Sequence, residues 1–178
     1  MIPLFLGLTV ANLTLLAVVF IMGLNAIDAA GGATGWYAYH VAAGIGAGLV
    51  TVLTHVAVYT YFMATTKWLA AATDKVALDE VRFVSPARRR KSRQFVVMMT
   101  VVGLTMLTMF AGAGADSTLS PLWPAQVHQV LAMIAIAANV LAAAIEYQLI
   151  RAQGQLIDQA LAQVDQPSPG PGLQGAGS

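Results

Sequence analysis

Residues 37–63 read YAYHVAAGIGAGLVTVLTHVAVYTYFM, and this stretch decides the fold of the chain. It contains no Asp, Glu, Lys or Arg. In an α-helix, about 20 apolar residues at 1.5 Å per residue suffice to cross the ~30 Å hydrocarbon core of a bilayer. The stretch is therefore predicted to be a transmembrane helix.

The whole chain has the composition of an integral membrane protein. Of its 178 residues, 58% are hydrophobic and 10% are charged, whereas a soluble domain has roughly 25% charged residues. Cysteine is absent, which excludes disulfides, thiolate metal sites and cysteine nucleophiles. Three further stretches are long and apolar enough to span a membrane. The predicted fold is all-α, a four-helix transmembrane bundle in a domain over 1–150, with helices at about 4–27, 37–63, 95–115 and 124–150.

The basic residues are gathered in one interval. All Lys and Arg residues except Arg151 lie within the segment 64–94, between the second and third predicted helices, and the connections 28–36 and 116–123 contain none. Loops that carry an excess of Lys and Arg stay in the cytoplasm. The segment 64–94 is therefore predicted to be a cytoplasmic loop. The helices then run up-down-up-down, with the N- and C-termini cytoplasmic.

The loop is predicted to contain a short surface helix over 68–83, which Pro86 ends because proline breaks helices. A basic run follows, and it is expected to contact anionic lipid or an acidic soluble partner. Nucleic acid is not expected as a partner, because the run is short and no recognition fold surrounds it. The residues of this lipid- or partner-binding surface are Arg88, Arg89, Arg90, Lys91 and Arg93.

The segment 151–178 is predicted to extend the last helix and then to end in a disordered tail. Ile157 and Leu161 continue the apolar pattern of the helix. From Pro167 onward the chain is rich in Pro and Gly, and such a composition neither forms a helix nor buries apolar surface.

Polar residues inside a membrane helix are costly, so they usually face the bundle interior and mark function. The second predicted helix has a stripe of such residues on one face, together with two glycines that let another helix or a flat ligand approach closely. The stripe consists of His40, Gly44, Gly48, His55 and Tyr59, at spacings of 4, 4, 7 and 4 residues.

The fourth predicted helix has a comparable stripe of His128, Asn139 and Glu146 among alanines. The second and fourth helices run in the same direction, so His40 and His128 are expected at one depth, about one turn into the membrane. Two histidines on facing helices, beside small residues, match the axial ligands of a haem b. His40 and His128 are therefore the candidate metal ligands, with Gly44, Gly48 and His55 as further cofactor-binding candidates.

The spacing of His40 and His55 resembles the paired histidines on one helix of di-haem membrane cytochromes b. The fourth helix departs from that pattern, because it has one histidine where two haems need two. At most one bis-histidine site is therefore expected. A (bacterio)chlorophyll, which accepts a single histidine, is an equal alternative by residue type. A further alternative is that no cofactor is bound and the histidines only hydrogen-bond across helices.

The run THVAVYTYFMATTKW, from Thr54 to Trp68, resembles a segment of uncharacterised four-helix bacterial membrane proteins. The resemblance covers only this run. It implies a multi-pass protein of the bacterial cytoplasmic (inner) membrane and supplies no activity.

Three functions are consistent with these helices and their polar residues. The favoured one is a small membrane subunit of a larger electron-transfer complex, which binds other membrane-protein subunits and holds a haem b or another tetrapyrrole. A second is a purely structural accessory subunit. A third is a proton or small-solute conduit, with Glu146, Asn139 and Tyr59 as the proton relay. No catalytic constellation is present in the sequence, so the chain is not expected to be an enzyme by itself.

Overall fold

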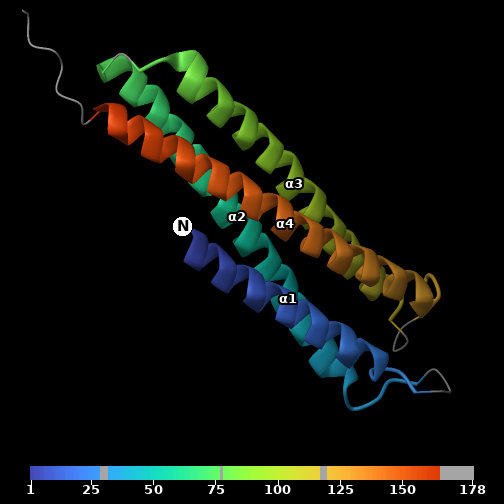
Figure 1. Ribbon diagram of the computed structural model, residues 1–178. Helices are drawn as coiled ribbons and strands as arrows, with labels where there is room; N and C mark the ends of the chain where they lie inside the picture. The colour runs from blue at the N-terminus through green and yellow to red at the C-terminus, as the bar shows by residue number, and fades with distance from the viewer. Residues whose placement is uncertain (29–31, 77, 117–119, 165–178) are drawn as a thin grey trace, which may run out of the picture.

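The computed structural model describes residues 1–28, 32–76, 78–116 and 120–164. Four helices run side by side along one axis (Figure 1): α1 (Ile2–Leu24), α2 (Tyr37–Val76), α3 (Glu80–Gly114) and α4 (Ala125–Val164). All four are long and apolar enough to cross a membrane. This confirms the prediction of an all-α chain with four apolar helices and indicates a multi-pass membrane protein.

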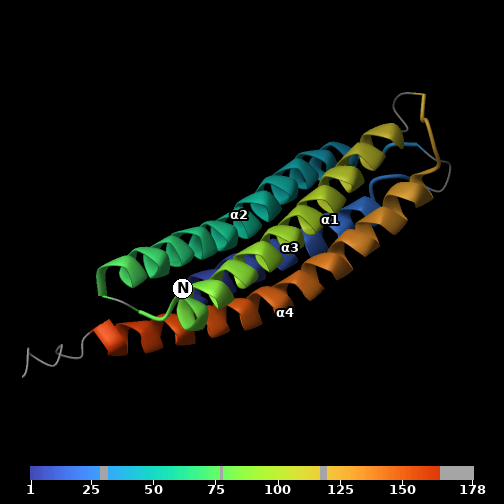
Figure 2. The ribbon, with the colours of Figure 1, turned by 90° about the horizontal axis from the view of Figure 1, so that it is seen from above.

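The connections that follow α1 and α3 lie at the same end of the bundle, and the connection between α2 and α3 lies at the other (Figures 1 and 2). We call the first the two-loop end and the second the basic end, because the latter carries the basic run. Neighbouring helices pack as α1 on α2, α2 on α3 and α3 on α4, and α4 also contacts α1 and α2.

Much of the bundle surface is apolar. Large side chains such as Val10, Leu53 and Phe110 are 63%, 65% and 71% exposed. They point away from the bundle along the spans, where a lipid environment removes the cost of exposing apolar surface to water.

The helices at the basic end are longer than the sequence predicts. We expected the second helix to end near residue 63, a loop over 64–94 and a separate surface helix over 68–83. Instead, α2 continues to Val76 and α3 already begins at Glu80. At 1.5 Å per residue the 40 residues of α2 extend about 60 Å, roughly twice the thickness of the hydrocarbon core. Part of α2, α3 and α4 therefore projects beyond the membrane.

Pro86 lies inside α3 and does not end a helix, contrary to our expectation. Asp79 caps the N-terminus of α3, since its carboxylate accepts hydrogen bonds from the backbone N–H groups of Val81 (2.8 Å) and Arg82 (3.2 Å). An internal proline costs about 3 kcal/mol or more. The cap and the buried packing on both sides of Pro86 offset this cost.

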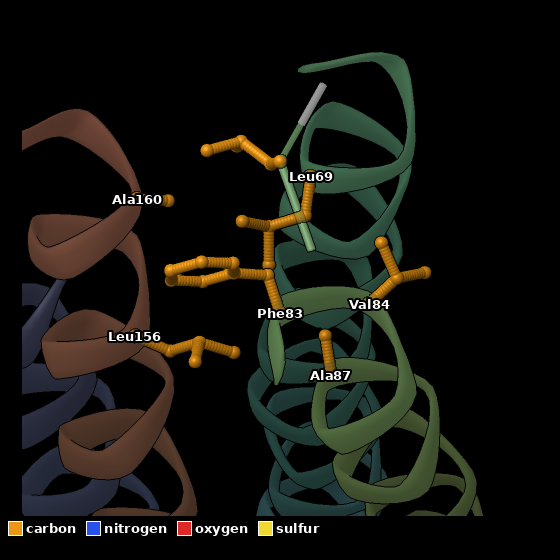
Figure 3. Close-up of a cluster of buried hydrophobic side chains, with 7 residues drawn as sticks. Leu69, Phe83, Val84, Ala87, Leu156 and Ala160 are labelled. Carbon is orange, nitrogen blue, oxygen red and sulfur yellow. The ribbon is translucent and has the colours of Figure 1, made fainter. Parts of the chain in front are cut away.

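That packing is an apolar cluster between the projecting parts of α2, α3 and α4 (Figure 3). Phe83 reaches from α3 toward Leu156 and Ala160 of α4, and Leu69 of α2 lies beside it. The first helix does not reach this region (Figure 1), so the three longer helices form a small core of their own. The predicted tail over 167–178 lies outside the described residues.

This cluster makes a prediction about stability. Replacing Phe83, whose side chain is fully buried, by Ala should lower the free energy of unfolding by about 3–5 kcal/mol. Val81→Ala is the matched control on the same helix, because Val81 is 77% exposed, and it should change the free energy by less than about 0.5 kcal/mol. Unfolding in mixed micelles measures both, and equal effects would show that the cluster does not hold the helices together.

Candidate functional site: two facing histidines and a buried polar network

The imidazole rings of His40 in α2 and His128 in α4 lie next to each other, edge to face, near the two-loop end. The centroids of their imidazole rings are 6.1 Å apart, and the ring planes are inclined by 69°. Both side chains are half-buried. The structure thus brings together the two histidines that the sequence placed at one depth.

Each imidazole is held in the same way by the helix that precedes its own. The Nδ1 atom of His40 is 3.1 Å from the carbonyl oxygen of Val19 in α1, and the Nδ1 atom of His128 is 3.0 Å from that of Thr108 in α3. A carbonyl oxygen only accepts hydrogen bonds, so each Nδ1 carries the proton. In the neutral ring the lone pair then lies on Nε2, the nitrogen free to bind a metal.

A glycine lies against each of these rings. A Cβ atom on Gly23 would be 2.9 Å from Cε1 of His40, and one on Gly112 would be 3.0 Å from Cε1 of His128. Both distances are shorter than ordinary van der Waals contact, so a side chain at either position would require the imidazole to shift, by a few tenths of an ångström in the case of Gly112. Each glycine lies one helical turn after the carbonyl that its histidine contacts. The helix pair α1–α2 and the helix pair α3–α4 therefore have the same arrangement of carbonyl, glycine and histidine.

The predicted glycine stripe of α2 has two different environments. A Cβ on Gly44 would have Val19 Cγ1 as its nearest neighbour, at 3.8 Å, which is an ordinary contact. Gly48 is buried beneath the Met109 side chain of α3. The flexible thioether of Met109 thus occupies the space that the missing side chain leaves.

The other predicted ligand, His55, belongs to a second site deeper in the bundle. Its Nδ1 lies 2.8 Å from Oε1 of Glu146, and its Nε2 lies 3.3 Å from Oδ1 of Asn139. Both nitrogens are thus engaged by α4, and His55 lies in this polar network, apart from the His40–His128 pair. The side chain is 2% exposed and that of Glu146 is fully buried.

All four helices contribute to the network. Gln94 of α3 donates from Nε2 to the same Oε1 of Glu146 that His55 contacts. Asn12 of α1 donates to Oδ1 of Asn139 at 2.9 Å, and Thr51 of α2 donates to Oδ1 of Asn12 at 2.8 Å. The network therefore fixes the mutual register of the four helices in the middle of the bundle.

Tyr59, the third member of the predicted proton relay, packs elsewhere. Its ring is half-buried and lies 5.5 Å from the ring of Phe95, centroid to centroid, on the side facing α3. Of the residues predicted for the proton relay, Glu146 and Asn139 therefore lie in the polar network with His55 and Gln94, and Tyr59 lies outside it.

The basic run lies along the surface of α3 near its start. Arg88 bonds to Glu80 at 3.3 Å in an exposed ion pair, while Arg90 bonds to the buried Gln153 of α4 at 3.4 Å. Lys91 and Lys67 both line a surface hollow of about 540 Å³ between α2 and α3. Arg89 and Arg93 are exposed.

Sequence reasoning missed Gln94, Gly23 and Gly112. Gln94 is the last residue before the apolar run 95–115 and was placed in a loop. Arg90 and Gln94 lie one turn apart on the same face only if one helix includes both. The structure shows that α3 does, because it begins at Glu80. The two glycines stand among many others, and nothing in their spacing singles them out.

No family model, curated protein or solved structure matches this chain.

The contact between Gly112 and His128 can be tested by adding a methyl group. Gly112→Ala should displace the imidazole and lower the free energy of unfolding by about 1–3 kcal/mol. Gly103→Ala on the same helix is the control, because its Cβ meets nothing within 4 Å. Alanine favours a helix over glycine by up to about 1 kcal/mol, so the control should be neutral or stabilising. Two variants of equal stability in thermal unfolding would contradict the tight contact.

Proposed function

We propose that this chain is a small membrane subunit of an electron-transfer complex, which holds a haem b between α2 and α4 with His40 and His128 as axial ligands. The separation of the two rings is the observation that carries the proposal. A metal ion about 2.0–2.1 Å from each nitrogen holds two opposed imidazole centroids roughly 6 Å apart. The observed separation is 6.1 Å.

The tautomer supports the same proposal. Metal-bound histidines almost always donate their other N–H to a carbonyl or carboxylate, which fixes the orientation of the ring. Both histidines donate from Nδ1 to a carbonyl oxygen in this way, one in the helix pair α1–α2 and the other in the pair α3–α4. An edge-to-face pair of aromatic rings also has this separation, but such a pair requires neither the two matched carbonyls nor the two glycines.

Small residues next to the two histidines would allow a flat ring to lie between α2 and α4. One turn deeper than each histidine lies a small residue, Gly44 on α2 and Ala132 on α4. Within the described parts of the chain, no three His, Cys, Asp or Glu side chains gather as a metal site. Two imidazoles match the two axial positions of a tetrapyrrole, whose own nitrogens supply the rest of the coordination. Its chemistry is one-electron transfer.

We further propose that the helices cross the bacterial cytoplasmic membrane up-down-up-down, with both termini and the basic end in the cytoplasm. The positive-inside rule supports this orientation. Lys67 and Lys91 beside an apolar hollow are suited to an anionic lipid headgroup. The exposed arginines of the same surface are suited to acidic groups of other subunits.

The alternative is an accessory subunit without a cofactor. In that case the histidines and glycines serve only to pack the helices, and the polar network only to join them. The two proposals differ in the visible spectrum of the protein.

Visible spectroscopy tests whether the protein binds haem. Protein produced with a supply of haem should show a reduced-minus-oxidised difference spectrum of a b-type cytochrome. His40→Ala and His128→Ala should each abolish or alter this spectrum, while His55→Gln should retain it, because His55 lies in the other site. Folded protein without any tetrapyrrole absorption would exclude the haem proposal, as would an unchanged spectrum in both alanine variants.

The proposed orientation in the membrane can be tested with single cysteine variants, because the chain has no cysteine of its own. Gly35→Cys places a thiol at the two-loop end. The position is exposed, and a Cβ atom added there meets no other side chain within 4 Å. Ser92→Cys places one on the exposed surface of the basic end. An impermeant maleimide should label the first variant in intact cells and the second only after the membrane is opened. The opposite pattern would reverse the proposed topology.

A further inference from the structure

Two buried oxygen atoms in the polar network have no hydrogen-bond partner. They are Oε2 of Glu146 and Oε1 of Gln94, and both side chains are fully buried. The two side chains are bonded to each other through their other polar atoms, from Nε2 of Gln94 to Oε1 of Glu146. A buried acceptor without a donor costs about 1–3 kcal/mol, and more for a charged group. Two such atoms on a bonded pair therefore point to a missing donor.

His55 contacts two hydrogen-bond acceptors of α4. Asn139 donates from Nδ2 to the carbonyl oxygen of Ala135 at 2.8 Å, so its Oδ1 is the atom that faces His55. The imidazole thus lies between two acceptors, Oδ1 of Asn139 and Oε1 of Glu146. Only the doubly protonated ring donates to both.

We propose that Glu146 is a proton-binding site, in which a proton on Oε2 is donated to Oε1 of Gln94. One added proton then satisfies both unpartnered oxygens. The reaction is the binding and release of a single proton, and it involves no other reactant. The ionised form makes Oε1 of Glu146 the stronger acceptor for His55 and Gln94 but leaves two oxygen atoms unpaired, whereas the protonated form pairs those oxygens but weakens the bonds to Oε1. Each form thus has one cost that the other lacks, which suits a site that changes its protonation.

The titratable and charged groups around Glu146 come from three helices. On α2 they are His55 and, one turn further, Tyr59, whose ring packs on Phe95. On α3 the charged group is Arg90, one turn from Gln94. Arg151 of α4 is exposed.

On the remaining side, α1 presents the amide of Asn12 to the network, through its bond to Asn139. The neighbouring Tyr147 of α4 is 37% exposed. His55 is therefore the titratable group in direct contact with Glu146.

A second polar layer lies between this site and the basic end. Gln153, two turns along α4 from Glu146, is fully buried and donates to Oγ1 of Thr65 at 3.1 Å. It also accepts from Arg90, whose side chain reaches the surface. Toward α1 the way is closed by the buried apolar side chains of Phe5 and Phe62. We therefore place the path of the proton from Gln94 past the layer of Arg90 and Gln153 to the basic end.

This site is distinct from the haem site. Glu146 follows His128 by 18 residues on the same helix, which is about 27 Å. Failure to find haem leaves the proton site intact, and the converse also holds.

The composition of the chain provides a direct test, because Glu80 and Glu146 are its only glutamates. Selective ¹³C labelling of the glutamate carboxyl carbons in bilayer-reconstituted protein gives two NMR signals. The variant Glu80→Gln assigns them and changes only an exposed side chain. We expect the Glu146 signal to move between two positions, protonated and ionised, as the pH is varied over the range in which the protein stays folded. A Glu146 signal at one position over that whole range would overturn the proposal.

The path is tested by the rate of exchange between the two forms. Gln153→Leu should slow this exchange at least tenfold, because it interrupts the layer between Glu146 and the basic end. Thr105→Val is the matched control: Thr105 is also buried but bonds only to a carbonyl of its own helix, on the side of the two-loop end. An unchanged rate in Gln153→Leu, or equal slowing in both variants, would overturn the path to the basic end.

Discussion

Hydrocarbon offers no hydrogen bonds, so polar side chains in the middle of this bundle must find their partners on other helices. The network around Glu146 is the constraint on which the rest of the structure depends. It takes one residue or more from each of the four helices and fixes their rotation and their depth relative to one another. A lipid-facing apolar surface specifies neither, because one aliphatic side chain packs against acyl chains as well as another. The network thereby also sets the faces of α2 and α4 that meet at the two-loop end, where His40 and His128 lie opposite each other.

The parts of the fold that the sequence predicted are those governed by local composition. Length and hydropathy located the four helices, since a span in lipid needs an uninterrupted apolar run. Helical periodicity placed His40 and His128 on inward faces at one depth. The projecting ends of α2 and α3 were missed because hydropathy reports only the part in lipid. Their helical state depends on packing between Phe83 and Leu156, which are far apart in sequence. The same error hid Gln94, which became a partner of Glu146 only when α3 began early enough to include it.

The two proposed sites divide the bundle by depth. The imidazole pair lies near the two-loop end and suits a redox group, while the carboxylate of Glu146 lies about 27 Å along α4, toward the basic end. Separate electron and proton sites on one small bundle are compatible with a subunit whose redox state and protonation respond to each other. The helices that would carry such coupling are α2 and α4, because each contributes to both sites.

The central claim is that His40 and His128 share one metal ion, and the electron paramagnetic resonance spectrum of the oxidised, haem-loaded protein tests it most directly. Two axial imidazoles produce a strong ligand field and a low-spin ferric iron. If the rings keep their inclination of 69° when haem binds, the signal would be the strongly anisotropic low-spin signal of nearly perpendicular imidazoles, rather than the signal of parallel ones. A high-spin ferric signal, which a single axial histidine gives, would contradict the account even if the protein carried haem.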